Sequence, residues 1–278
     1  MLDYIEVELK LMPFEPNNEV VVALLSEIGY ESFLEDNNAV KAYIPKPAFN
    51  EEELSPVLSH FKEIDVSITS TVSLIPAQNW NHIWEKEFAP VFLPNLTILA
   101  PFHGEEFRHD RYIEIEPKMS FGTGHHDTTA MMCNAMSEID FQNKKVLDMG
   151  TGTGLLAILA EQLGAAHISA VDIEEWAVEN AKDNATRNRC QKVLILRGDI
   201  DCVENETFNV LLANINKNVL LRHLPAYEKL LEQRGQLLLS GFFNYDDKEL
   251  IQSALHCNLK IHKKYEKNNW SCLWFHKS

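Results

Sequence analysis

Apolar and polar positions over the first 75 residues switch between a period of two and a helical period. The stretch "YIEVELK" (4–10) alternates as a half-buried strand does, whereas "NEVVVALLSEIGYESFLED" (18–36) has helical spacing with Gly29 near its end. The same switch repeats in the strand-like 38–46, the helical 50–64 and the strand-like 65–76. This alternation predicts a small α+β sandwich, ferredoxin-like, over residues 1–75.

A segment rich in tryptophan follows at 76–95. In "AQNWNHIWEKEFAPVFLPN", Trp80, Trp84 and Phe88 recur at every fourth residue, so they share one face of a short helix that Pro90 and Pro94 end. The stripe predicts a linker helix packed against a neighbouring domain, with contact to a substrate as the alternative.

From residue 96 onward, short apolar strands alternate with amphipathic helices. Such alternation is typical of a parallel sheet covered by helices on both faces. The last segment, "LKIHKKYEKNNWSCLWFHKS" (259–278), reads as two strands around a polar turn and predicts an antiparallel hairpin at the sheet's edge. Residues 96–278 are therefore expected to form one α/β domain.

Composition narrows the class of partner. The 278 residues are 45% hydrophobic and 24% charged, which is ordinary for a globular protein with a full core, and the formal net charge is -16. The chain shows no dense Lys/Arg cluster, so direct nucleic-acid binding is not expected. An acidic surface suits a basic protein partner, although acidity also serves solubility alone.

Cysteine usage and the N-terminal pattern favour a cytoplasmic protein. The five cysteines are scattered without a CxxC pair, which argues against a disulfide framework and against a cysteine-rich zinc site. The N-terminal "MLDYIEVELK" is charged and alternating, unlike a signal peptide, and no apolar run approaches the ~20 residues that span a bilayer.

A glycine turn is the strongest candidate for chemistry. In "VLDMGTGTGLLAILA" (146–160), Gly150, Gly152 and Gly154 join a strand to a helix and allow close approach of a ligand. A dinucleotide fingerprint needs glycine where Leu155 stands. Asp148, two residues before the turn, disfavours a pyrophosphate but suits a cationic amine. The pattern therefore favours S-adenosylmethionine over NAD.

Three polar residues follow later strands of the same domain. Asp172 ends "ISAVD" and is placed to accept both ribose hydroxyls, a feature that NAD enzymes share. Asp199 in "RGD" is either an acceptor for the adenine amine or a helix-cap aspartate. Asn214 in "LLANI" is placed to orient an incoming amine. No aromatic platform follows Asn214, so a flipped nucleobase fits poorly as the acceptor.

The chain resembles the class I S-adenosylmethionine-dependent methyltransferases in the order of four motifs, "VLDMGTGTG", "VDI", "GD" and "ANI". "FGTGHHDTT" (121–129) is similar to the AFGTGTHPTT-type signature of the bacterial methyltransferases acting on ribosomal protein L11. The small N-terminal domain and the Trp-rich linker also match that family's layout, so the resemblance covers nearly the whole chain.

The resemblance implies a Rossmann-like, mostly parallel sheet with a C-terminal antiparallel hairpin. It further implies that the N-terminal domain recognises L11 and that the monomeric enzyme trimethylates lysine side chains and the N-terminal amine. Thr129, Gly150, Asp172 and Asn214 would contact the cofactor, and Phe121, Gly122 and Thr123 would form a loop closing over it. To these the residue-based reasoning adds Gly152, Asp148 and Asp199.

Two departures from the family pattern lie near the expected site. His125-His126-Asp127 stands where the family has Thr-His-Pro, and Asn216-Lys217 replaces small apolar residues. Adjacent residues do not readily face one ion and no further His or Cys cluster completes a shell, so no metal is expected.

Other classes of function stay open at this point. They are a methyltransferase acting on another protein or a small molecule, a NAD-dependent oxidoreductase, and a non-catalytic ribosome-assembly binder that keeps the fold.

Overall fold

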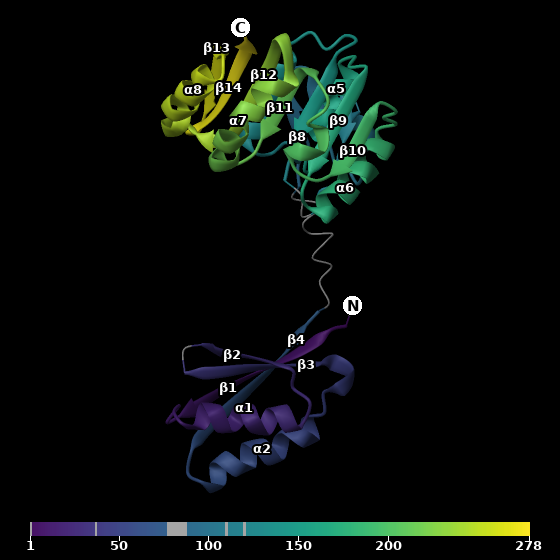
Figure 1. The fold of residues 1–278 in the computed structure, drawn as a ribbon. Helices are drawn as coiled ribbons and strands as arrows, with labels where there is room; N and C mark the ends of the chain where they lie inside the picture. Colours follow the sequence, from purple (N-terminus) through teal and green to yellow (C-terminus); the bar gives the residue numbers. More distant parts are fainter. Residues whose placement is uncertain (1, 37, 77–87, 109–110, 119–120) are drawn as a thin grey trace. The chain divides into compact units, whose positions relative to one another are not determined.

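The computed structural model describes residues 2–36, 38–76, 88–108, 111–118 and 121–278. The chain forms two compact units, Met1–Phe88 and Ala89–Ser278, each with its own sheets and helices (Figure 1). The division falls inside the segment 76–95 that the sequence marks as a linker. The predicted linker helix lies mainly in 77–87, outside the described residues, so the arrangement of Trp80 and Trp84 stays a prediction.

The first unit is a four-stranded antiparallel sheet with two helices on one face. Its strand order is β2-β3-β1-β4, which with the βαββαβ succession is the ferredoxin-like arrangement. The elements are β1 (Tyr4–Met12), α1 (Asn17–Glu27), β2 (Ser32–Asp36), β3 (Ala39–Pro45), a 3-10 turn (Lys46–Ala48), α2 (Glu51–Glu63) and β4 (Ser67–Ile75).

Alternation in β1 decides which face of this sheet is buried. Ile5, Val7 and Leu9 point into the core with Leu25 of α1 and Phe61 of α2, whereas the intervening residues face outward. Helix α2 begins where the side chain of Asn50 accepts a hydrogen bond from the amide of Glu52.

The second unit is built on a seven-stranded sheet of order β10-β9-β8-β11-β12-β14-β13. The five strands from β10 to β12 run parallel, and β14 is antiparallel to both β12 and β13. Its strands are β8 (Lys145–Met149), β9 (His167–Asp172), β10 (Val193–Arg197), β11 (Phe208–Asn214), β12 (Leu231–Phe243), β13 (Leu259–Lys267) and β14 (Trp270–Lys277). The predicted mostly parallel sheet with a C-terminal antiparallel hairpin is confirmed.

Helices cover both faces of this sheet. Helices α4, α5 and α6 pack on one face and α7 and α8 on the other. Their bounds are α4 (Asp127–Met136), α5 (Leu155–Gln162), α6 (Glu175–Arg187), α7 (Lys217–Leu230) and α8 (Asp247–His256), with 3-10 turns at Ile200–Val203 and Asn244–Asp246. A separate three-stranded sheet, β5 (Val91–Leu93), β6 (Leu96–Leu99) and β7 (Tyr112–Glu114), precedes α4, with a 3-10 turn at Glu105–Phe107 before β7.

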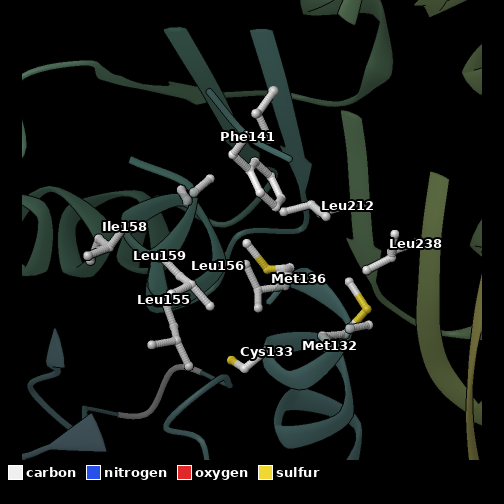
Figure 2. Packing of buried hydrophobic residues seen from close by; sticks show 14 of the residues in the cluster. Met132, Cys133, Met136, Phe141, Leu155, Leu156, Ile158, Leu159, Leu212 and Leu238 are labelled. Carbon is white, nitrogen blue, oxygen red and sulfur yellow. The ribbon is translucent and has the colours of Figure 1, made fainter. Parts of the chain in front are cut away.

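The central strands are buried on both sides, as the apolar runs predict. On β8, Val146 packs into the layer beneath α4 and α5, and its neighbour Leu147 packs into the layer beneath α7 and α8. Figure 2 shows the first of these layers, in which Met132 and Met136 of α4 gather with Leu212 of β11. These two layers fix the carboxyl ends of the parallel strands, where open α/β sheets bind ligands.

Within the described residues, no helix has the length and apolarity needed to cross a membrane.

Candidate active site

A cavity of about 460 Å³ opens at the carboxyl edge of the parallel strands. Six of the residues predicted from the sequence line it: Phe121, Gly150, Gly152, Asp172, Asp199 and Asn214. The other four, Gly122, Thr123, Thr129 and Asp148, do not line it; all but Thr123 directly precede or follow a residue that does. The cavity therefore joins β8, β9, β11 and the segment before α4, as the motif order predicts.

The glycine turn needs glycine for conformational and steric reasons. Gly150, Gly152 and Gly154 have φ angles of 74°, 55° and 82°, in the left-handed region that other residues rarely adopt. A Cβ on Gly150 would also collide with Ile215, and one on Gly152 would collide with the carbonyl of Phe121. The turn is thus packed tightly against the loops that complete the cavity.

All five amides of this turn are bonded within the protein. The bonds are Gly150 N to Val171 O (2.8 Å), Thr151 N to Val171 O (3.0 Å), Gly152 N to Asp172 Oδ2 (2.9 Å), Thr153 N to Phe121 O (3.1 Å) and Gly154 N to Thr151 O (2.9 Å). A dinucleotide site presents such amides to a pyrophosphate. Here they are already satisfied, so the turn shapes the cavity wall and offers no set of donors to an anion.

Asp172 is held rigidly at the end of β9. Its Oδ2 accepts from the amide of Gly152 and its Oδ1 accepts from the amide of Glu174 at 3.0 Å. Each carboxylate oxygen keeps a further lone pair, and the residue lines the cavity. This geometry fits a pair of vicinal hydroxyl groups.

Asp199 caps a 3-10 turn, as one of its two predicted roles requires, and its place in the cavity wall leaves the other role a prediction. Its Oδ1 accepts from the amide of Ile200 at 2.8 Å, which caps the 3-10 turn, and its carboxylate also lines the cavity. On α7, His223 Nε2 lies 3.4 Å from Asp199 Oδ1, and Arg222 Nη2 lies 3.8 Å from Asp199 Oδ2. Burial lowers the pKa of His223, and the nearby Asp199 partly offsets this effect.

Asp148 is buried beneath the turn. Its Oδ2 accepts from the hydroxyl of Thr151 at 2.6 Å and from the amide of Ala157 at 3.2 Å, so it ties the glycine turn to the first turn of α5. Burial raises the pKa of Asp148 to about 7, against the opposite effect of these two hydrogen bonds. No described protein group hydrogen-bonds to its Oδ1.

Asn214 ends β11 on the other side of β8 from Asp172. Its Nδ2 donates to the hydroxyl oxygen of Thr129 at 3.3 Å. Its Oδ1 is a buried acceptor that no described protein group satisfies. A cavity-lining amide with a free oxygen is suited to accept a hydrogen bond from a ligand amine.

Comparisons with known proteins identify the family of this chain. The family model described as ribosomal protein L11 methyltransferase (PrmA) matches residues 15–278. The chain belongs to the ribosomal protein L11 methyltransferase family. A relative from Phocaeicola vulgatus carrying that name is 37% identical over 278 residues, 99% of each chain, and one from Chlorobaculum parvum is 38% identical over 253 residues, 87% of each chain.

Solved structures place the fold in the same group. The crystal structure of ribosomal protein L11 methylase from Lactobacillus delbrueckii subsp. bulgaricus has a TM-score of 0.64 and 25% identity, covering 69% of this chain and 100% of that one. A methyltransferase from Pyrococcus furiosus has a TM-score of 0.51 and 18% identity, covering 60% of this chain and 89% of that one. At this identity the similarity supports a shared fold only. The predicted class I methyltransferase fold is confirmed.

The predicted loop Phe121–Thr123 contacts the glycine turn of this methyltransferase fold. The carbonyl of Gly122 accepts from the hydroxyl of Thr153 at 2.7 Å, and the exposed ring of Phe121 borders the cavity. The hydroxyl of Thr123 lies 3.2 Å from Nδ1 of His125. The loop is thus tied to the glycine turn through the carbonyl of Gly122.

The residues that depart from the family pattern do not all lie at the cavity. His126 lines the cavity, while Nε2 of His125 is 2.9 Å from the carbonyl oxygen of Ala89. Asn216 lines the cavity and caps α7 by accepting from the amide of Val219 at 3.2 Å. Lys217 does not line it.

Lys217 instead pairs with Asp246 at 2.8 Å and Glu249 at 3.0 Å. Hydrogen bonds to these two carboxylates, the larger effect coming from Asp246, raise the pKa of Lys217 to about 12.

Sequence reasoning missed an aromatic side of the cavity. Trp270, the first residue of β14, lines it; its ring stacks on Phe243 with centroids 4.0 Å apart and meets the edge of His126 at 4.7 Å. His126 in turn lies 5.1 Å from the ring of Phe121. We call these four residues, Phe121, His126, Trp270 and Phe243, the aromatic wall.

Among the described residues, no three His, Cys, Asp or Glu side chains converge as ligands for a metal ion.

Proposed function

We propose that this chain transfers methyl groups from S-adenosylmethionine to amines of ribosomal protein L11, on lysine side chains and on the N-terminal amine. The observation that carries the cofactor assignment is the glycine turn with its five amides satisfied internally beside the fixed carboxylate of Asp172. Membership of the L11 methyltransferase family supports the choice of substrate.

The residues of the cavity fit the cofactor in distinct ways. Asp172 would accept the ribose hydroxyls, and Asp199, held near His223, would accept from the adenine amine. Asp148 would attract the amino-acid end from beneath the turn, and Thr129 would act by orienting Asn214. When bound, S-adenosylmethionine supplies an electrophilic methyl group on a sulfonium.

The chain's contribution to the reaction is mainly positioning. A lysine amine has a reference pKa of about 10.4, so it must lose its proton before it attacks. Desolvation in the cavity lowers that pKa, and the proton passes to water at the mouth. Oδ1 of Asn214 would accept from the neutral amine and direct its lone pair towards the methyl group.

The first unit has the charge that a basic protein substrate requires. Residues 1–76 contain 14 acidic and four basic side chains, a net formal charge of -10 out of -16 for the whole chain. We assign recognition of L11 to this unit, since complementary charge speeds association and favours the correct partner. The same charge disfavours direct binding to nucleic acid. We also propose that the enzyme acts as a monomer in the cytoplasm. Size-exclusion chromatography with light scattering tests the oligomeric state.

Intact-mass spectrometry of purified L11, incubated with the protein and labelled S-adenosylmethionine, tests the proposal. Mass increments of whole methyl groups would establish the reaction and count the methyls. Binding of the cofactor without increments would break the substrate assignment and leave a methyltransferase acting on another acceptor. Absence of cofactor binding would favour a non-catalytic ribosome-assembly role.

A further inference from the structure

Asp127 links the start of α4 to a distant turn. It is the first residue of α4 and stands where the family signature has proline. Its Oδ1 lies 2.9 Å from Nζ of Lys267, and its Oδ2 accepts from Nδ2 of Asn268 at 2.9 Å. The Asp127 side chain is only 20% exposed, so both oxygens are committed to this contact. We call the three residues Asp127, Lys267 and Asn268 the turn clamp.

The turn that the clamp holds carries Trp270 into the cavity. Strands β13 and β14 are joined by Asn268 and Asn269, whose φ angles of 48° and 68° are those of a tight two-residue hairpin turn. Trp270 follows at once, pairs with Lys267 in the strand register and lines the cavity. The position of its ring therefore depends on the position of the turn.

The clamp and the aromatic wall meet at adjacent residues. His126, next to Asp127, contacts the ring of Trp270, while Trp270 also stacks on Phe243. In the sheet order β10-β9-β8-β11-β12-β14-β13, Trp270 and Phe243 of the wall lie on the same side of β8 as Asn214. Asp172 and Asp199 lie on the other side. A shift of the turn would thus change the end of the cavity that contains Asn214 and leave the end that contains Asp172.

We propose that Asp127 and Lys267 are positioning residues for methyl transfer, which hold Trp270 against His126 so that the aromatic wall confines the acceptor amine beside Asn214. This inference rests on the proposed function, because it assigns the Asn214 end of the cavity to the acceptor. It concerns a pair of residues that act through Trp270 and do not touch the cofactor.

The chain offers a matched control for this pair. Lys263, also on β13, pairs with Glu138 just beyond the end of α4 at 2.6 Å. Both ion pairs therefore tie β13 to the region of α4, and the lysines are similarly exposed, 57% for Lys267 and 44% for Lys263. Neither Lys263 nor Glu138 lines the cavity. Ion pairs this exposed contribute little to stability, so both lysine variants should fold.

The test compares Lys267→Met with Lys263→Met in the full chain. For Lys267→Met we expect the KM for L11 to rise and kcat to fall, each by roughly three- to tenfold, because a loosened wall orients the amine less well. The Kd for S-adenosylhomocysteine by calorimetry should stay within about twofold of wild type. Lys263→Met should match wild type in all three quantities. Asp127→Asn should reproduce Lys267→Met, and Asp127→Glu should restore part of the activity.

Equal kinetic effects of the two lysine variants, or an equal loss of cofactor affinity and turnover in Lys267→Met, would overturn the inference. Amide hydrogen exchange over residues 267–270 gives a readout that needs no acceptor. Faster exchange is expected in Lys267→Met but not in Lys263→Met, and unchanged exchange would count against the clamp. A wild type that clamps the turn yet transfers no methyl group to L11 would instead refute the proposed function.

Discussion

The side-chain amide of Asn214 donates to the hydroxyl of Thr129, 85 residues earlier in the chain, and this bond leaves its carbonyl oxygen free at the cavity. Because the nitrogen is engaged, the amide has one orientation, with the acceptor atom available to an incoming amine. We therefore propose that Thr129 acts by orienting Asn214, although Thr129 does not line the cavity.

We expect Asn214→Ala to lower kcat by about 100-fold while the Kd for S-adenosylmethionine changes by less than about threefold. The reason is that, in the proposed site, Asn214 would orient the amine, whereas Asp172 and Asp199 would hold the cofactor. Steady-state kinetics and calorimetry measure the two effects. Thr129→Val, which keeps the shape but removes the hydroxyl, should produce a smaller loss of the same kind. Equal losses of turnover and cofactor affinity would refute the role of Asn214.

Asp172→Ala should weaken cofactor binding by about tenfold or more, because it removes a carboxylate that accepts charge-assisted hydrogen bonds. It also leaves the amide of Gly152 without its acceptor. Calorimetric titration with S-adenosylhomocysteine measures the change. Asp183→Asn is a suitable control, since Asp183 pairs with Lys118 outside the cavity. Unchanged affinity in Asp172→Ala would refute the assignment.

NADH should not bind at the glycine turn. The five amides that a pyrophosphate would need are bonded to Val171, Asp172, Phe121 and Thr151. Fluorescence energy transfer from tryptophan to NADH is the measurement, and Trp176 and Trp270 border the cavity as donors. A saturable signal that S-adenosylhomocysteine displaces would contradict this prediction.

The buried carboxyl of Asp148 makes stability depend on pH. Its pKa is raised from 3.8 to about 7 in the folded protein, so the folded state binds a proton more tightly than the unfolded state. The stabilising contribution is complete below about pH 4 and is lost as the pH rises to about 7, by an amount on the order of a few kcal/mol. Thermal unfolding measured across this pH range should show the melting temperature of the wild type falling as the pH rises, and a smaller fall for Asp148→Asn. Parallel pH profiles would contradict it.

The acidic first unit predicts that binding of L11 depends on salt. The KM for L11 should rise severalfold as ionic strength increases from about 0.05 M to about 0.3 M, since the Debye length shortens. The Kd for S-adenosylhomocysteine should change much less, because the proposed cofactor site is a cavity of the second unit and includes no residue of the acidic first unit. Kinetics and calorimetry over the same salt series separate the two. A KM that does not respond to salt would argue against charge-driven recognition.

Local patterns carry enough information to predict the sheet, the glycine turn and the order of the polar residues. Each of these depends on a short segment, such as the apolar run that ends at Asp172. The contribution of Trp270 was missed because it depends on the insertion of β14 between β12 and β13, which no local period reveals.

Long-range side-chain contacts were equally out of reach. The bond between Asn268 and Asp127 spans 141 residues, so neither residue shows its role in its own segment. Asp148 was expected to attract the ligand's amine, which stays a proposal, and spacing alone did not show that its carboxylate is buried. The strand places it correctly, but Thr151 and Ala157 draw its carboxylate beneath the turn.

Strand β13 ends the seven-stranded sheet on one side, with one edge paired to β14 and no described strand on its other edge. Such an edge is a template for pairing with a second molecule. Lys260, Lys263, Lys264 and Lys267 place four positive charges along these nine residues. The lysines that make ion pairs with α4 and its surroundings thereby also discourage edge-to-edge association, and they keep the sheet from extending into an aggregate.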